Sequence, residues 1–295
     1  MRPPGGGAAV EIRAVAVLGA GTMGHGIAQV AAAGGCEVRL YDVDNAAAAA
    51  GLDRIRENLD QGIARGKVTE DERERTLARI RPTGSLPDAV RDADLVIEAA
   101  PESIDLKARI FADVDASARD DAILATNTSS LSIARIADSV REPGRFIGLH
   151  FFNPVHIMKL VEVVCGPQTA ERTRETAVAF VERLGKEAVV VNDAPGFASS
   201  RLGVALGMEA IRMVEQGVAS PEAIDKAMEL GYRHPMGPLR LTDLVGLDVR
   251  LGIAEYLHEA LGSEAFAPPE LLRRMVAEGK LGRKSGRGFY DWKDG

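Results

Sequence analysis

The sequence predicts an α/β protein: a doubly wound, mostly parallel sheet with an inserted helical hairpin, followed by a smaller all-α domain. Short β-rich runs alternate with helical stretches from residue 11 to residue 193, and several runs, such as 15–18, are apolar throughout. Apolar strands of this kind are typical of a sheet that helices cover on both faces. After residue 193 the spacing is helical until the extreme C-terminus. We therefore expect a disordered leader at 1–10 and domains at 11–193 and 194–295.

The order of the elements follows from these patterns. The predicted strands are residues 12–18, 37–41, 95–99, 123–126, 146–149, 160–164 and 189–191. The patterns predict two helices at 45–65 and 69–81, joined at 66–68. Thr69 and Glu72 have the spacing of a capping box at the start of the second helix. In the second domain, residues 201–216 and 221–230 have helical spacing, Ser220 is placed as an N-cap, and Gly217 and Gly231 suit helix ends.

Charge and cysteine content exclude several classes of partner. The 295 residues carry 36 basic and 43 acidic side chains, a net charge of −7, so no global positive field is present to bind nucleic acid or an anionic membrane. No apolar run approaches the length of about 18 residues that a membrane helix needs. Cys36 and Cys165 are far apart and form no metal-binding motif. We expect a cytoplasmic protein without a metal site.

A glycine-rich segment follows the first predicted strand and opens a helical stretch at 27–33. It consists of Gly19, Ala20, Gly21, Thr22, Met23 and Gly24. In this context the three glycines allow a tight turn, close approach of a diphosphate to the backbone, and packing of helix on strand. The pattern predicts a Rossmann-type dinucleotide site, and the alternative is an ordinary glycine-rich turn.

Asp42 lies at the end of the second predicted strand, 18 positions after Gly24. A carboxylate there accepts hydrogen bonds from ribose hydroxyls and repels a 2′-phosphate. No arginine follows immediately, so the sequence favours NAD over NADP as the cofactor. The alternative is that Asp42 is simply a turn residue.

His150 ends an apolar run, and Glu162 lies in the next run, 12 positions later. If the two runs are neighbouring strands, the carboxylate can orient the imidazole and stabilise the imidazolium that forms when the ring takes a proton. An alcohol oxidation needs such a base while hydride goes to a nicotinamide. A histidine at a strand end is often only structural, and the nearby dinucleotide site is what favours catalysis.

Ser129 follows another strand and is expected at the carboxyl edge of the sheet, where it could bind a substrate oxygen. A hydrolase triad of Ser129, His150 and Glu162 is the competing interpretation, but no GxSxG elbow surrounds the serine. We assign Ser130 as the N-cap of a short helix at 131–137.

Several motifs together resemble the NAD-dependent 3-hydroxyacyl-CoA dehydrogenase family, over about residues 15 to 292. They are GAGTMGHGIA (19–28), DLVIEA (94–99), NTSSL (127–131), GLHFFNPV (148–155), MKLVEVV (158–164), APGF (194–197), HPMGPLRLTDLVGLD (234–248) and GRKSGRGFY (282–290). Their order and spacing make the resemblance specific.

The resemblance implies roles for individual residues. His150 corresponds to the family's base and Glu162 to its orienting partner, while Ser129 corresponds to its substrate-contacting serine. Further cofactor contacts are implied for Glu102, Lys107, Asn127, Ser129, Asn153 and Lys284. Positions implied for the CoA end of the substrate, besides Ser129, are Asn58, Arg65 and Lys67, although a solvated, salt-bridged helix pair is an equally good interpretation of that hairpin.

The sequence also departs from the family pattern. Ser200 stands where the family often has an active-site asparagine, and a hydroxyl lacks the reach of an amide. His156 stands where a proline is usual, which adds a titratable group near the site. The family's helical domain carries a homodimer interface, and apolar positions there either serve that interface or form the domain's own core: Leu202, Leu206, Met213 and Val214.

We expect NAD-dependent oxidation of a (3S)-3-hydroxyacyl-CoA, with 3-hydroxybutyryl-CoA as the expected substrate. Ser129, His150, Glu162 and Ser200 are the expected catalytic residues. One alternative is a dehydrogenase of a free hydroxy acid or a sugar acid such as gulonate. Another is a non-catalytic NAD(H)-binding protein, suggested only by Ser200. No motif encodes the acyl chain length.

Overall fold

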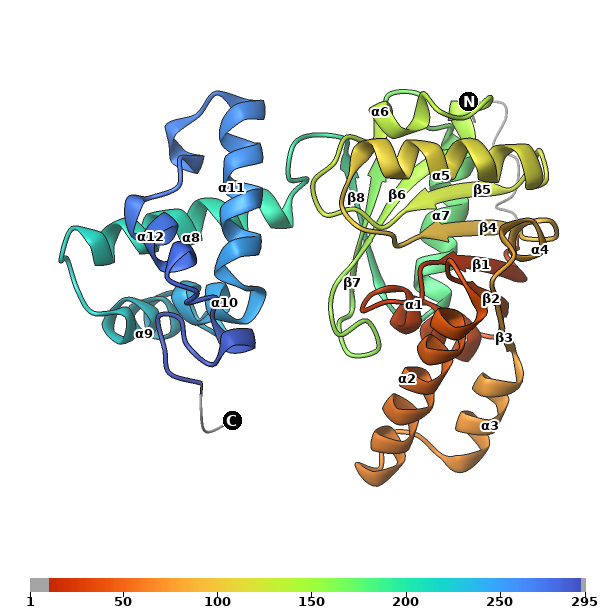
Figure 1. The fold of residues 1–295 in the computed structure, drawn as a ribbon, viewed down its shortest axis with the longest axis horizontal. Helices are drawn as coiled ribbons and strands as arrows, with labels where there is room; N and C mark the ends of the chain where they lie inside the picture. The colour runs from red at the N-terminus through yellow and green to blue at the C-terminus, as the bar shows by residue number, and fades with distance from the viewer. Residues whose placement is uncertain (1–10, 293–295) are drawn as a thin grey trace, which may run out of the picture. The chain divides into compact units, whose positions relative to one another are not determined.

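The computed structural model describes residues 11–292, so the predicted leader at 1–10 lies outside the described residues. The chain divides into two compact units that meet between Ala194 and Pro195. The first is a sheet flanked by helices and the second is helical (Figure 1). The predicted fold class is confirmed.

The sheet of the first unit has the strand order β3-β2-β1-β4-β5-β6-β7-β8. The strands are β1 (Ala14–Leu18), β2 (Glu37–Tyr41), β3 (Ile80–Thr83), β4 (Leu95–Glu98), β5 (Ile123–Thr126), β6 (Phe146–Phe151), β7 (Leu160–Cys165) and β8 (Glu187–Asn192). All neighbours pair in parallel except β6 and β7, which are antiparallel. Because the order reverses between β1 and β4, the carboxyl ends of these two strands frame the crevice in which such sheets bind ligands.

Helices cover both faces of this sheet, as the apolar strands require (Figure 1). On one face lie α1 (Gly24–Ala33) and α7 (Glu171–Arg183), and on the other lie α4 (Leu86–Val90), α5 (Ile104–Ser117) and α6 (Ile133–Ala137), with the short 3-10 helix η1 (Pro143–Arg145) before β6. Every residue of β4, β5 and β6 is buried.

An ion-pair cluster around the buried Asp115 anchors the C-terminal part of α5. Asp115 accepts hydrogen bonds from Arg141 and from Arg145, which precede β6. Burial alone would raise the pKa of Asp115, but the bonds from Arg141 and then Arg145 outweigh it and lower this pKa below its ordinary value. The carboxylate therefore stabilises the folded unit only while it is ionised.

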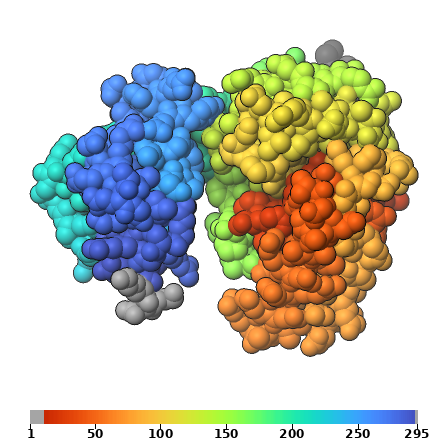
Figure 2. Space-filling model, viewed as in Figure 1, coloured from red at the N-terminus to blue at the C-terminus, as the bar shows by residue number. Residues whose placement is uncertain are grey.

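The helical hairpin, α2 (Asn45–Ala64) and α3 (Glu70–Ala78), projects from the sheet and forms the orange lobe of the space-filling view (Figures 1 and 2). The capping box of Thr69 and Glu72 is confirmed. The prediction that the second helix continues to residue 81 is wrong, because Ile80 is buried and pairs with Val38 in edge strand β3. Pro82 is tolerated there, since an edge strand has only one partner to which N–H groups must donate.

The predicted cap of the helix after β5 is also wrong. The N-cap of α6 is Ser132, whose hydroxyl accepts from the backbone N–H of Arg135, and Ser130 lies in the preceding turn. There, the backbone N–H of Ser130 donates to the Thr128 hydroxyl at 3.4 Å. The helix starts two residues later than expected because Ser132 also binds Asp193 at 3.0 Å, a contact across 61 residues that local patterns do not reveal.

The second unit consists of α8 (Ser199–Glu215), α9 (Pro221–Tyr232), α10 (Pro238–Val245), α11 (Leu247–Leu261) and α12 (Glu270–Ala277), with short 3-10 helices η2 (Glu264–Phe266) and η3 (Arg283–Ser285). Ser220 caps α9 as predicted. Gly231 does not end that helix, since it continues to Tyr232 and Arg233 takes the left-handed position at the end. These helices enclose their own core, which includes Met208, Leu239 and Leu257.

Candidate active site

The glycine-rich turn connects β1 to α1 at the carboxyl edge of the sheet. A Cβ placed on Gly24 would lie 1.6 Å from the carbonyl oxygen of Gly19, so only glycine permits this packing. At Gly21, in contrast, no atom lies within 4 Å of an added Cβ, and the backbone there is open to a ligand. Met23, the N-cap of α1, makes no side-chain capping bond and the first turn has no acidic residue. The amides of this helix end are therefore suited to a diphosphate.

Asp42, directly after β2, holds the turn in place. One carboxylate oxygen accepts the backbone N–H of Ala20 at 2.7 Å, and the other accepts that of Val43 at 2.7 Å. Each oxygen has a second lone pair, so the same carboxylate can also accept ribose hydroxyls. The structure thus brings Asp42 and the glycine-rich turn together, as the sequence predicted.

Helix α2 supports the same turn, which the sequence analysis missed. Arg54 donates to the carbonyl oxygen of Ala20 at 2.8 Å. One turn earlier, a Cβ on Gly51 would lie 2.5 Å from the Cβ of Ala20, so the helix packs closely against the loop. In the sequence, only the spacing of Gly51 and Arg54, three residues apart on one face of the predicted helix, could have indicated this contact.

His150 and Glu162 are directly opposite each other in the antiparallel β6–β7 pair. His150 Nδ1 lies 2.7 Å from Glu162 Oε2, and the side chains are only 9% and 1% exposed. The ring of Phe152 packs against the imidazole with centroids 4.3 Å apart. Since Nδ1 is bonded to the carboxylate, proton exchange with a substrate would use Nε2.

Ser129 is held by Glu102 from the loop after β4. The Oε1 atom of Glu102 accepts the backbone N–H of Ser129 at 3.0 Å, its hydroxyl at 3.3 Å, and the hydroxyl of Thr128 at 2.5 Å. These bonds connect the loop after β5 to the loop after β4. They fix the direction in which the Ser129 side chain leaves the sheet edge.

Glu102 in turn lies near a buried ion pair, also at the sheet edge. Lys107 and Glu98 are both fully buried, with Nζ donating to Glu98 Oε1 at 2.7 Å. Lys107 also donates to the carbonyl oxygen of Ala100 at 3.2 Å and lies 3.6 Å from Glu102. The other oxygen of Glu98 accepts the Thr126 hydroxyl at 2.6 Å. The sequence analysis did not single out Glu98, although a carboxylate at the end of an otherwise apolar strand could have indicated a buried polar contact there.

Asn127 joins this network to the pair of His150 and Glu162. Its backbone N–H donates to the carbonyl oxygen of Glu98 at 2.7 Å, and its side-chain oxygen accepts the backbone N–H of Phe151 at 2.9 Å. Phe151 directly follows His150. The ends of β4, β5 and β6 are therefore connected by hydrogen bonds.

Two of the expected residues, Ser200 and Lys284, lie in the second unit. Ser200 is the second residue of α8 and is half-buried. Lys284, in η3, forms an ion pair with Asp248 at 2.6 Å. In the same unit, Asp243 anchors the C-terminal segment by accepting the backbone N–H groups of Phe289 and Tyr290, each at 2.9 Å.

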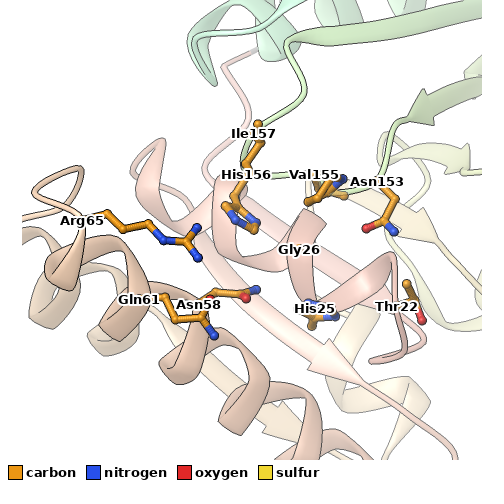
Figure 3. A pocket seen from close by; sticks show the side chains of 11 residues that line it. Thr22, His25, Gly26, Asn58, Gln61, Arg65, Asn153, Val155, His156 and Ile157 are labelled. Carbon is orange, nitrogen blue, oxygen red and sulfur yellow. The ribbon is translucent and has the colours of Figure 1, made fainter. Parts of the chain in front are cut away.

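A cavity of about 290 Å³ lies between α1, α2 and the loop after β6 (Figure 3). Asn58 and Arg65, two of the residues expected to bind CoA, line it together with Asn153. His25 and His156 line it as well, whereas Lys67 does not belong to its lining. Asn58 donates to Gln29 at 3.3 Å.

In the part of the chain that the structure describes, no group of three or more His, Cys, Asp or Glu side chains could hold a metal ion. Within residues 11–292, every helix is too short or too polar to cross a bilayer.

Two family models match nearly all of the described residues. Residues 14–194 match the NAD-binding domain of 3-hydroxyacyl-CoA dehydrogenase, and residues 196–292 match its C-terminal domain. The chain belongs to the 3-hydroxyacyl-CoA dehydrogenase family.

Three similar members of the 3-hydroxyacyl-CoA dehydrogenase family come from bacteria. The probable 3-hydroxybutyryl-CoA dehydrogenase of Bacillus subtilis (strain 168) is 49% identical over 285 residues, which cover 97% of this chain and 99% of that protein. The 3-hydroxybutyryl-CoA dehydrogenase of Bradyrhizobium diazoefficiens is 44% identical, with 97% of each chain covered. A crystal structure of (S)-3-hydroxybutyryl-CoA dehydrogenase from Ralstonia eutropha superposes with a TM-score of 0.92 at 42% identity, covering 96% of this chain and all of that one.

Proposed function

We propose that the protein oxidises the 3-hydroxyl group of a (3S)-3-hydroxyacyl-CoA with NAD⁺ and catalyses the reverse reduction with NADH. The observation that carries the proposal is the buried pair of His150 and Glu162 at the sheet edge that also bears the glycine-rich turn. The printed names of the relatives support 3-hydroxybutyryl-CoA as the substrate.

The residues at the turn fit a dinucleotide. The open backbone at Gly21 and the uncapped amides of α1 receive the diphosphate, while Asp42 accepts ribose hydroxyls and disfavours a 2′-phosphate. Further contacts are proposed for Glu102, Asn127, Ser129, Asn153 and Lys284. Lys107 is fully buried, so we propose that it acts by holding Glu98 and Glu102. When bound, the nicotinamide accepts hydride from the carbon that bears the hydroxyl.

His150 is the proposed general base. In the oxidation, the O–H and C–H bonds of the substrate break and a C=O bond forms; the proton goes to His150 Nε2 and the hydride to the cofactor. Glu162, 2.7 Å from Nδ1, keeps the ring in the required tautomer and stabilises the imidazolium. In the reduction the same imidazolium returns its proton to the oxygen.

Ser129 and Ser200 are proposed to bind substrate oxygens. Glu102 accepts both the backbone N–H and the hydroxyl of Ser129, which holds the serine at the carboxyl edge of the sheet. A hydroxyl at position 200 supplies one hydrogen bond where an asparagine would supply more.

The test is the loss of NADH absorbance when the purified protein is mixed with acetoacetyl-CoA, with acetoacetate and with NADPH as controls. Oxidation of NADH with the thioester alone supports the proposal. Oxidation with the free acid favours a hydroxy-acid dehydrogenase instead. If NADH binds but no 3-ketoacyl-CoA is reduced, the protein is a binding protein, and Ser200→Asn is the first variant with which to seek activity.

A homodimer is the proposed assembly. Leu202, Leu230 and Tyr232 of the second unit are 72%, 73% and 76% exposed, so their apolar side chains are available for contact with a second copy. Met213 and Val214 instead pack against the core of that unit. Light scattering coupled to gel filtration gives the mass directly, and a monomer at micromolar concentration contradicts this assembly.

A further inference from the structure

One buried cation of the second unit lacks the counter-charge that buried cations ordinarily have. Arg250, in α11, is only 6% exposed, and its Nε atom is buried without a hydrogen-bond partner among the described residues. The other buried lysine and arginine side chains of residues 11–292 have partners: Lys107 and Arg145 pair with carboxylates, and Lys186 donates to two carbonyl oxygens. A buried charge without a counter-charge is unfavourable, so Arg250 indicates that a ligand supplies the missing anion.

The two acidic residues of α11 that are nearest to Arg250 in the sequence do not neutralise it. Asp248 forms an ion pair with Lys284 at 2.6 Å, and Glu255 pairs with Arg273. Burial lowers the pKa of Arg250 to about 10, and no carboxylate of the described residues opposes this effect. The guanidinium therefore remains a cation near pH 7.

The guanidinium of Arg250 lies against α8, which packs on α11 in the second unit (Figure 1). A Cβ added to Gly203 would lie 3.4 Å from Nη1 and 3.9 Å from Nη2 of Arg250, so the glycine leaves these terminal nitrogens uncovered on this side. Gly203 is itself only half-buried. Nη1 and Nη2 form the fork that binds both oxygens of a carboxylate.

Two features of α8 favour an anion along this face. The N-cap position is an alanine without a side-chain bond, and the first turn contains no acidic residue, so nothing there offsets the positive end of the helix dipole. Ser200, to which the proposed function assigns a substrate oxygen, lies three residues before Gly203 and therefore on the same face. Three residues of helix span about 4.5 Å. An extended carbon chain covers that length in about four bonds.

We propose that Arg250 binds a carboxylate at the far end of the acyl chain, so that the protein prefers 3-hydroxyacyl-CoA substrates whose chain of about six carbons ends in an acid. The proposal rests on the proposed function for the thioester and for the place of Ser200. In a six-carbon chain, four bonds lead from the carbon that bears the 3-oxygen to an oxygen of the terminal carboxylate. A chain that ends in a methyl group leaves the guanidinium unpaired, which is the source of the preference.

The experiment is titration calorimetry of the full-length protein, with NAD⁺ present, against adipyl-CoA and hexanoyl-CoA. Both thioesters have six-carbon chains, and they differ in a terminal carboxylate against a terminal methyl group. Neither carries a 3-hydroxyl group, so neither is oxidised during the titration. We expect adipyl-CoA to bind about 10- to 100-fold more tightly, as for hydrogen bonds between two charged groups.

The variant Arg250→Met is expected to reduce this preference to within about twofold. Arg250→Lys keeps the charge but not the fork, and an intermediate preference is expected. Arg274→Met, which removes an exposed arginine on α12, is the matched control and should retain the wild-type preference. Because methionine removes an unpaired buried charge, the melting temperature of ligand-free Arg250→Met should equal or exceed that of the wild type.

Three results would overturn the inference. The first is equal affinity of the wild type for the two thioesters. The second is a preference that Arg250→Met leaves unchanged, and a lower melting temperature or a changed mass of that variant would then assign the arginine to the fold or to a contact between copies. The third is an equal loss of affinity for both thioesters and for CoA itself, which would assign the guanidinium to a phosphate.

These titrations require no turnover. A failure of the proposed function appears as absent NADH oxidation with acetoacetyl-CoA, whereas a failure of the present inference appears in the ratio of the two affinities. The two failures are therefore distinguishable. Where the protein does reduce acetoacetyl-CoA, the values of kcat/KM for 3-oxoadipyl-CoA and 3-oxohexanoyl-CoA should show the same preference as the binding data, and the same loss in Arg250→Met.

Discussion

Replacing Glu162 by glutamine tests how the charge of this residue contributes to catalysis. Glutamine has nearly the same shape, and its carbonyl oxygen can still accept from His150 Nδ1, now 2.7 Å from the carboxylate. The hydrogen bond to the neutral ring is therefore retained. What is lost is the attraction between the carboxylate and the imidazolium that forms as the hydroxyl proton is transferred.

The burial of the two side chains determines how much kcat falls when the carboxylate of Glu162 is lost. Both side chains are nearly inaccessible to water, at 9% and 1% exposure, so solvent screens the pair weakly. Two unit charges about 4 Å apart interact by about 4 kcal/mol at an effective dielectric constant of about 20. Part of that energy is already balanced by desolvation, which leaves about 2 to 4 kcal/mol, or about 30- to 1,000-fold in kcat.

The assay is steady-state oxidation of NADH by acetoacetyl-CoA, repeated with NADH deuterated at the transferred position. A slower chemical step should bring the isotope effect on kcat closer to its full value, while NADH affinity and melting temperature stay near those of the wild type. Glu187→Gln, which removes an exposed carboxylate on β8, is the matched control. A wild-type kcat in Glu162→Gln would refute the reasoning.

Three further predictions concern the frame around the site. Gly21→Ala should lower the affinity for NADH but change the free energy of unfolding by less than about 1 kcal/mol, because the added Cβ meets no protein atom. Gly24→Ala should lower the free energy of unfolding in urea by about 3 kcal/mol or more, because its Cβ would overlap the backbone of Gly19. Equal stabilities of the two variants would contradict this prediction. Lys107→Met should destabilise the fold by about 3 to 5 kcal/mol, because it leaves the Glu98 carboxylate buried without its partner. Adding Glu98→Gln should restore part of that stability. A double variant no more stable than Lys107→Met would contradict the assigned energetic coupling of Lys107 and Glu98. The pKa of Asp115 is lowered in the folded state, so its carboxylate stabilises the fold above about pH 4 and loses this effect as the pH falls. Asp115→Asn should therefore make the melting temperature fall less between about pH 6 and about pH 3 than it does in the wild type. An unchanged fall would count against a stabilising role of the ion pairs of Asp115 with Arg141 and Arg145.

Local patterns in the sequence were sufficient for the frame of the fold. The pairing that brings His150 opposite Glu162 could be anticipated because the two apolar runs follow each other in the sequence, separated only by residues 152–159. The position of Asp42 beside the glycine-rich turn followed from the spacing of adjacent strands in the same way. In both cases the interacting residues lie on consecutive elements of the chain.

Contacts between distant segments were not predictable from such patterns. The helix predicted over 69–81 includes Ile80 and Arg81, the first two residues of β3, and only their pairing with β2 shows that they form a strand. The capping role of Ser132 depends on Asp193 on a remote segment. The supporting bond from Arg54 to the glycine-rich turn crosses 34 positions. These interactions are set by how helices pack on the sheet, which composition and periodicity leave open.

The most direct test of the central claim is the turnover of His150→Ala with NADH and acetoacetyl-CoA, measured beside its NADH affinity. Without the base, kcat is expected to fall about 100- to 10,000-fold while the dissociation constant for NADH stays within about twofold, since the glycine-rich turn and Asp42 are untouched. A variant that reduces acetoacetyl-CoA at close to the wild-type rate would contradict the assignment of His150 as the group that exchanges the proton.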